Sequence, residues 1–125
     1  MFCDGHVLSL LDNPVTIRHA PEERSGVQLD GSELIVSGQA EHLQRRVFDW
    51  LKGHTKDVIA PRAELMADQL GKKIGKISVR NTRSRWGSCS HAGNLSFCWR
   101  LILTPNWVLN YVIAHEVSHL AHMNH

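Results

Sequence analysis

The sequence lacks most features of a secreted, membrane or polyanion-binding protein. No apolar run reaches transmembrane length, and residues 1–6 show no basic region followed by an apolar stretch, so we expect neither membrane association nor a signal peptide. The net charge of +2 is too small to indicate a polyanionic partner by itself. The three cysteines are odd in number and form no CxxC pair, which predicts reduced thiols in a cytoplasmic protein.

The length and the order of the sequence patterns predict one small α+β domain. A chain of 125 residues has room for a single hydrophobic core, and it holds no internal repeat or low-complexity tract. Residues 1–38 are expected to form an N-terminal β region, residues 39–73 to be helical, and residues 76–125 to form a strand, a loop, a second strand and a final helix. This order predicts a mixed or antiparallel sheet packed on helices.

Turn residues and alternating polarity indicate where the strands lie. Asp30-Gly31 is a strong two-residue hairpin signal, so the first third of the chain is expected to be a small antiparallel sheet. Residues 77–80 predict another strand, and residues 81–90 predict a polar, arginine-rich loop. Apolar residues alternate again over residues 95–103, which predicts a half-buried strand that runs directly into the last helix.

The helical region keeps one apolar face over most of its length. Leu43, Val47 and Leu51 fall at helical spacing, and the pattern continues to Gly71, which suits a C-terminal cap. Pro61 leaves two interpretations open, because it either starts a second helix or kinks one long helix. The apolar and aromatic side chains here are expected to belong to the core rather than to a cofactor site.

The most informative motif is the HExxH pattern His115-Glu116-Val117-Ser118-His119. On a helix, its two histidines lie one turn apart on the same face and can bind one metal ion together. Glu116 lies close enough to act on a water molecule at that metal, as the general base of a zinc hydrolase does. The motif therefore predicts a Zn²⁺ site.

The segment around the motif favours this interpretation. Thr104 and Pro105 suit the N-cap and the first position of a helix, and the following residues are apolar almost all round, which predicts a central, buried helix. Two histidines and a glutamate are costly in such a helix unless something binds them, and a metal ion supplies that compensation. The alternative is a core helix whose histidines are only hydrogen-bonded.

A hydrolytic zinc ion usually takes a third protein ligand. His125 follows His119 at the spacing of motifs in which the chain leaves the helix and turns back to the metal, and Asn124 could make that turn. His125 is therefore the preferred third ligand. A site without a local third ligand is the first alternative. His122 comes last, since it points further along the helix axis and is expected to be a surface residue.

Basic residues gather before Trp86, among them Arg83 and Arg85. The leading interpretation is structural, with the arginines holding loop carbonyl groups and Trp86 filling a gap in the core. The alternatives are a solvated charged face, an anion site for the substrate, or a phosphate-backbone contact in which Trp86 stacks. Arg83, Arg85 and Trp86 are thus candidate substrate- or anion-binding residues.

Five segments carry a resemblance to a known family. They are residues 83–90 (RSRWGSCS), 93–95 (GNL), 99–102 (WRLI), 111–116 (YVIAHE) and 123–125 (MNH). With these segments the chain resembles the YgjP-like metallopeptidase family, which is related to the SprT-like and WLM zinc proteases. The resemblance is dense from residue 77 to residue 125 and weak before it.

The resemblance implies a minimal gluzincin-like fold, that is, a small zincin-like domain with a C-terminal HExxH helix. It also implies a zinc ion on His115, His119 and His125, Glu116 as the base, and a bacterial cytoplasmic protein. Members of the family usually continue beyond the NH dipeptide, so this chain is expected to be a fragment or a minimal form. The resemblance leaves the substrate open, and the oligomeric state stays unknown.

Together these observations favour a zinc-dependent hydrolase, most directly a metallopeptidase in which Glu116 activates a zinc-bound water molecule. A peptide or protein is then the substrate, and by analogy with zincins the strand at residues 95–103 lines the cleft and pairs with it. Two alternatives give the basic loop a role: a metal-dependent nucleotide phosphohydrolase, and a DNA-associated protease-like module. A zinc-stabilised scaffold without turnover is the last alternative.

Overall fold

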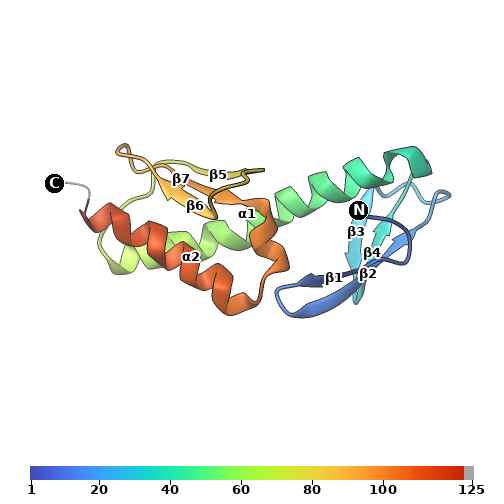
Figure 1. Ribbon diagram of the computed structural model, residues 1–125, viewed down its shortest axis with the longest axis horizontal. Coiled ribbons are helices and arrows are strands. Elements are labelled where there is room, and N and C mark those ends of the chain that lie inside the picture. Colours follow the sequence, from blue (N-terminus) through green and yellow to red (C-terminus); the bar gives the residue numbers. More distant parts are fainter. Residues whose placement is uncertain (123–125) are drawn as a thin grey trace.

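Two sheets and two α-helices make up the part of the chain that the computed structural model describes, residues 1–122 (Figure 1). The long helix α1 (Leu43–Gln69) runs along the molecule. A four-stranded sheet lies against its N-terminal half, and a three-stranded sheet and helix α2 (Asn106–Ser118) flank its C-terminal half. The architecture is α+β, as the sequence predicts. None of the described helices is both long and apolar enough to cross a membrane.

The first sheet has the strand order β1-β2-β4-β3 and is mixed. Its strands are β1 (Val7–Leu10), β2 (Asn13–His19), β3 (Val27–Asp30) and β4 (Glu33–Val36). The predicted hairpin is confirmed, since β3 and β4 pair antiparallel across a turn at Gly31 and Ser32. The prediction of a purely antiparallel sheet is wrong, because β4 pairs parallel with β2. The chain passes from β2 to β3 at the outer edge of the sheet, and the hairpin then returns β4 to the position beside β2.

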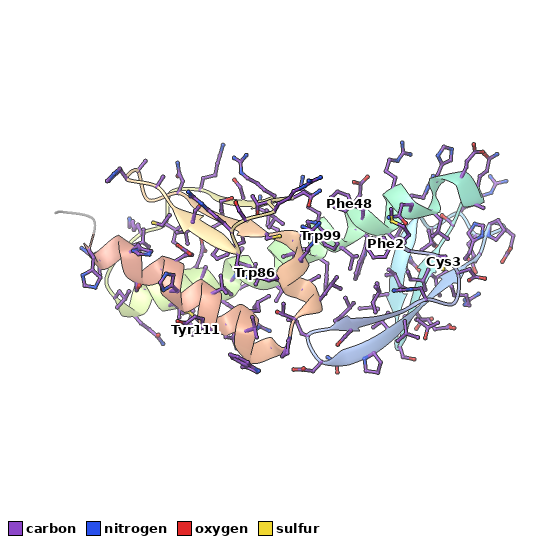
Figure 2. The ribbon with its side chains drawn as sticks, viewed as in Figure 1. Phe2, Cys3, Phe48, Trp86, Trp99 and Tyr111 are labelled. Atoms are coloured by element: carbon purple, nitrogen blue, oxygen red, sulfur yellow. The ribbon has the colours of Figure 1, made fainter. Side chains whose placement is uncertain are left out.

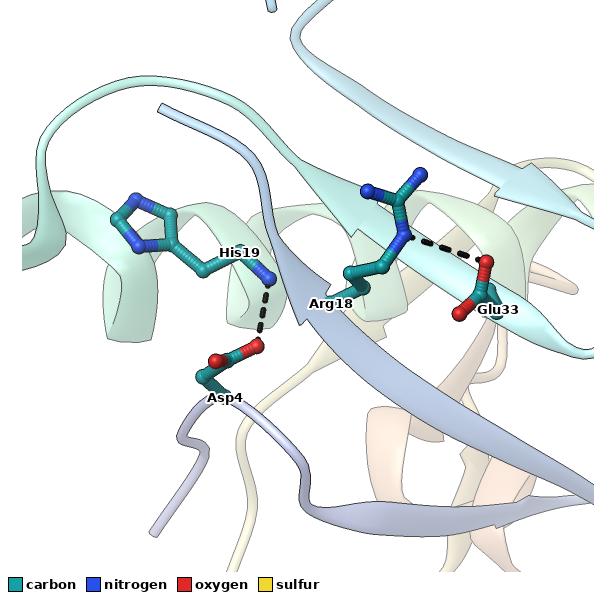
Figure 3. Close-up of polar contacts among 4 residues, drawn as sticks. All are labelled: Asp4, Arg18, His19 and Glu33. Atoms are coloured by element: carbon teal, nitrogen blue, oxygen red, sulfur yellow. Dashed lines mark hydrogen bonds and ion pairs between the residues drawn. The ribbon is translucent and has the colours of Figure 1, made fainter. Parts of the chain in front are cut away.

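Two polar contacts connect segments of this sheet (Figure 3). Arg18 Nε on β2 lies 3.2 Å from Glu33 Oε1 on β4, and the backbone N–H of His19 donates to Asp4 Oδ1 at 2.8 Å. The side chains of Arg18 and Glu33 are 44% and 45% exposed, so solvent screens their attraction and the pair contributes at most about 1 kcal/mol. The sheet therefore depends mainly on its buried apolar face, which includes Leu8, Ile17 and Leu34.

Helix α1 is continuous over 27 residues, so Pro61 lies inside one helix and starts no second one. Its buried face repeats every four residues and comprises Leu43, Val47, Leu51, Thr55, Ile59, Ala63 and Ala67. Gly71 follows the helix with a φ of +68°, and the N–H of Lys72 donates to the carbonyl of Ala67 at 2.9 Å. This is a left-handed cap of the kind that glycine favours, which confirms the predicted helix end.

His54 gives the fold a pH-dependent element. Its ring stacks on Trp50 with centroids 4.5 Å apart, burial lowers the pKa of His54, and the nearby Asp57 carboxylate opposes that shift only in part. Between the folded pKa and the ordinary value of 6.5 the unfolded chain binds more protons, so the free energy of unfolding rises with pH across that window and falls in acid. We expect the urea midpoint of the parent to fall more steeply than that of His54→Gln between about pH 7 and pH 5. Equal slopes would contradict this assignment.

The second sheet has the strand order β5-β7-β6. Its strands are β5 (Ile77–Arg80), β6 (Gly87–Cys89) and β7 (Leu95–Cys98). Strand β5 is the predicted one, whereas β6 lies inside the segment that the sequence predicts to be a loop. Strand β7 pairs parallel with β5 and antiparallel with β6, so β7 is central and β6 is an edge strand.

The prediction of one strand over residues 95–103 is wrong in its second half. Strand β7 ends at Cys98, and Trp99–Leu103 form a 3₁₀ helix, η2. There Trp99, Leu101 and Ile102 turn inward and are at most 6% exposed. A 3₁₀ turn and a strand can both present apolar residues in close alternation, so the pattern alone does not separate them.

Helix η2 lies between the two buried clusters of the molecule. The first cluster joins the four-stranded sheet to the N-terminal half of α1, and the second joins the three-stranded sheet, α2 and the C-terminal half of α1. Ile102 belongs to the first cluster and Leu101 to the second. The Trp99 ring packs edge-on against Phe48 and Phe2, with centroids 5.2 and 6.2 Å away (Figure 2). The Trp99 contacts belong to the first cluster, whereas Leu101 and Ile102 are neighbours in η2 that pack into different clusters. Helix η2 therefore joins the two halves of the fold just before α2 begins.

Helix α2 begins one residue later than predicted and without the predicted cap. The helix starts at Asn106, with Pro105 in the N-cap position. The hydroxyl of Thr104 donates to the carbonyl of Leu101 at 2.6 Å, so it closes η2 instead of capping α2.

The prediction that α2 is buried almost all round is also wrong. Trp107 and Tyr111 are 71% and 65% exposed, because α1 and the second sheet cover only one side of the helix. Arg62 of α1 holds the covered side of α2 in place, because its Nη1 donates to Asn106 Oδ1 at 2.8 Å and to Asn110 Oδ1 at 2.9 Å. The buried side comprises Leu109, Val112, Ile113, Glu116 and Val117. Glu116 is therefore the one acidic residue that α2 carries into the interior.

Candidate metal centre

The HExxH residues lie where α2 ends. His115 and Glu116 occupy its last turn, and His119 is the residue at its C-terminal boundary, after which the chain continues as the 3₁₀ helix η3 (His119–His122). The rings of His115 and His119 have centroids 5.0 Å apart and planes at 84°. The side chain of His119 is 49% exposed. The two imidazoles thus stand together at the surface, within reach of an ion from solvent.

The spacing of these rings suits one shared metal ion. An ion held by two imidazoles in tetrahedral geometry, about 2.1 Å from each nitrogen, brings their centroids to about 5 Å from each other. The observed separation agrees with this requirement. Neutral imidazole nitrogen is also a donor that zinc prefers. His115 and His119 therefore fit a zinc ion in both spacing and chemistry.

The predicted third position falls at the end of the chain. His125, the predicted ligand, lies outside the described residues. Within residues 1–122, no group of three His, Cys, Asp or Glu side chains is arranged to hold a metal ion. His122 is exposed and lines the same cavity as Glu116 and His119. Among the described residues, His115 and His119 are therefore the two imidazoles that stand close enough to share an ion.

Glu116 lies beside this pair in a buried position. It is 7% exposed, and its Oε1 is 3.9 Å from Nε2 of His119. The carboxylate packs against the edge strand β6 at Gly87, where an added Cβ would lie 2.9 Å from Glu116 Cγ and 3.2 Å from its Oε2. Only glycine leaves room for the carboxylate at this point. This role of Gly87 was not predicted, although the place of Gly87 in the RWGSC string was a usable signal.

An open cavity of about 430 Å³ lies over Glu116 and His119. It is lined by Arg85, Gly87, Ser88, Cys89, His91, Glu116, His119 and His122. The cavity is bordered by β6, by the turn that follows it and by the end of α2. An edge strand, the buried carboxylate of Glu116 and the exposed imidazole of His119 therefore border one space.

Cys89 is a member of this site that the sequence analysis did not identify. Burial raises the pKa of the Cys89 thiol, and the negative charge of Glu116 raises it further. The thiol is therefore protonated at neutral pH and is unsuited to act as a nucleophile. Its register partner on β7 is Leu95, so Cys89 and Cys98 do not face each other, and both are free thiols.

The basic loop is built differently from the structural interpretation that the sequence favoured. Trp86 is 50% exposed and belongs to neither of the two buried clusters, so it fills no gap in the core. The arginine that holds a loop carbonyl is Arg100, whose Nη1 donates to the carbonyl of Thr82 at 3.2 Å. Arg83 and Arg85 are exposed and line a second cavity of about 450 Å³. Within residues 1–122 neither Arg83 nor Arg85 donates a hydrogen bond to a loop carbonyl, so the predicted structural role is not found for these two arginines there.

Comparison with known proteins gives one family match. No curated protein and no solved structure shows a significant match to the chain. A family model described as the YgjP-like metallopeptidase domain matches residues 2–125. The match includes the four-stranded sheet, so the likeness extends well beyond the second half in which the sequence motifs are concentrated. The chain belongs to the YgjP-like metallopeptidase domain family.

Proposed function

We propose that this protein is a zinc-dependent peptidase of zincin-like architecture, with His115 and His119 as metal ligands and Glu116 as the general base. The observation that carries the proposal is the juxtaposition of two imidazoles 5.0 Å apart with a buried carboxylate 3.9 Å from one of them. Membership of a metallopeptidase family supports a hydrolase of the peptidase type. His125 remains the proposed third ligand, and a cytoplasmic location remains part of the same proposal.

In the proposed reaction the substrate and the water are activated at the metal, and Glu116 transfers the proton. Bound zinc supplies Lewis-acid polarisation of the scissile carbonyl and makes water more acidic. The carboxylate of Glu116 accepts a proton from the attacking water and delivers it to the nitrogen of the leaving amine. Its buried position on α2, packed against Gly87, fixes the direction in which the oxygens point.

Strand β6 is the proposed place for an extended peptide. The strand predicted to line the cleft, residues 95–103, does not suit that role, because β7 is central and already pairs on both sides. Strand β6 has an unpaired edge in the described structure and borders the cavity of Glu116 through Gly87 and Ser88. An added strand at such an edge gains backbone hydrogen bonds independently of its sequence.

The test is metal content and peptide cleavage measured on the same full chain. We expect about one zinc per chain by elemental analysis and cleavage of members of a mixed peptide library by mass spectrometry. His115→Ala and His119→Ala should each weaken zinc binding by more than the roughly 10- to 100-fold that loss of a supporting hydrogen bond costs. His6→Ala, an exposed histidine beside β1, serves as the control. Zinc retained at parental affinity in both site variants would sink the proposal.

A further inference from the structure

A second cavity, of about 450 Å³, adjoins the proposed metal centre. It is lined by Thr82, Arg83, Ser84, Arg85, Trp86, Cys98 and Arg100. Arg85 lines this cavity and the cavity of Glu116 as well, so the two spaces are neighbours. Three of the lining residues are arginines and none is acidic.

One of the three positive charges is held in place. Arg100 Nη1 donates to Asn81 Oδ1 at 3.0 Å and to the carbonyl of Thr82 at 3.2 Å, and its guanidinium lies 5.1 Å from the centroid of the Trp99 ring. Trp99 is itself 6% exposed. A cation fixed in this way loses little further side-chain entropy when an anion arrives.

Cys98 also lines the cavity, and its thiol responds to the charge of Arg100. Burial by itself raises the pKa of Cys98, but hydrogen bonds with Arg100 and Thr82 and the charge of Arg100 outweigh burial, so the pKa lies below its ordinary value. The guanidinium contact is direct, with Nη1 3.7 Å from Sγ. The surroundings of the cavity thus stabilise the negatively charged form of the Cys98 thiol.

The other two arginines lack a counter-charge within residues 1–122. No described carboxylate forms an ion pair with Arg83 or Arg85. The loop that carries them is nevertheless held, since the Thr82 hydroxyl donates to the carbonyl of Arg85 at 2.7 Å and the N–H of Cys98 donates to the carbonyl of Trp86 at 2.9 Å. Like charges gathered in one cavity repel each other, and an anion bound between them relieves that repulsion.

We propose that this cavity is a subsite for an acidic side chain of the peptide substrate, so that the protein prefers to cleave near Asp or Glu. This inference rests on the proposed peptidase function. Arg85 precedes β6 by a single residue, Trp86, so a peptide extended along β6 passes the cavity within a few residues of Glu116. The guanidinium group of an arginine can bind a carboxylate through two parallel hydrogen bonds.

A single carboxylate suits the cavity better than a polyanion does. The net charge of the chain is only +2, which gives weak long-range attraction to nucleic acid. The arginines converge on one cavity rather than forming a stripe along the surface. An exposed Trp86 beside them could stack on a base, so binding of single-stranded DNA or a nucleotide is kept as an outcome of the test.

The test compares matched peptides that differ only by Asp or Glu against Asn or Gln near the cleaved bond. The parent is expected to show a kcat/KM ratio of about 10- to 100-fold in favour of the acidic member, the range of a charge-assisted hydrogen bond. The ratio should approach one in Arg83→Gln and in the double variant with Arg85→Gln. Arg24→Gln, which removes one exposed arginine between β2 and β3, should keep the parental ratio.

A binding measurement separates failure of this inference from failure of the peptidase proposal. Fluorescence anisotropy of the same peptides on Glu116→Gln is expected to favour the acidic member and to lose that preference in Arg83→Gln. Cleavage without acidic preference overturns the subsite and leaves the peptidase standing. If no peptide is cleaved, the peptidase proposal fails, and equal binding of the matched peptides then overturns the subsite as well. Binding of DNA or a nucleotide that depends on Arg83, without acidic-peptide binding, also overturns it.

Discussion

Glu116→Gln is expected to lower peptide turnover by at least about 10²-fold, because a positioned general base contributes roughly 10²- to 10⁴-fold to such reactions. The amide has nearly the shape of the carboxylate but cannot accept the proton of the attacking water. Glu116 is 7% exposed and packs against β6, so an isosteric replacement should leave the helix and the histidine pair in place. The measurements are kcat on a cleaved peptide, zinc per chain and the thermal midpoint.

Two comparisons decide what a loss of activity means. His119→Ala should lose zinc and turnover together, whereas Glu116→Gln should lose turnover alone. His91 and His122 line the same cavity, so each is varied to alanine in parallel. If Glu116→Gln turns over as fast as the parent, the base is another group and the proposed mechanism is wrong.

Local spacing was sufficient to predict the central part of the candidate site. His115, Glu116 and His119 belong to one helical turn, and the geometry of a helix fixes their relation without any tertiary information. The apolar face of α1 was predictable for the same reason, since it repeats every four residues from Leu43 onward. The family resemblance also came from contiguous strings and was confirmed over almost the whole chain.

Features that depend on distant contacts were not predictable in this way. Strand β6 is three residues of polar and small side chains, and only pairing with β7 makes it a strand. The exposed face of α2 follows from what packs beside the helix, since Trp107 and Tyr111 are apolar enough to have been buried. The approach of Gly87 to Glu116 joins two segments that no sequence pattern connects. Tertiary packing therefore decides which side of a local motif faces the cavity.

Gly87→Ala is expected to lower turnover by about 10²-fold, because small displacements of a catalytic group can cost that much. The new Cβ would lie 2.9 Å from Glu116 Cγ, 3.2 Å from Glu116 Oε2 and 3.3 Å from Cδ1 of Phe97. Phe97 is 1% exposed and has no room to move, so the side chain of Glu116 must be displaced. Overpacking of this kind also lowers the free energy of unfolding by about 1–3 kcal/mol.

Gly53→Ala is the matched control for this substitution. Gly53 lies within α1, and apart from its chain neighbours and the adjacent helix backbone no described atom would come within 4 Å of a Cβ added there. Because glycine in a helix interior costs about 0.5–1 kcal/mol relative to alanine, this variant should be slightly more stable than the parent and equally active. Zinc per chain should stay at the parental value in both variants, since the three atoms nearest to a Cβ added at Gly87 belong to Glu116 and Phe97 rather than to an imidazole. Parental kcat in Gly87→Ala would mean that the contact between β6 and the carboxylate does not orient the base.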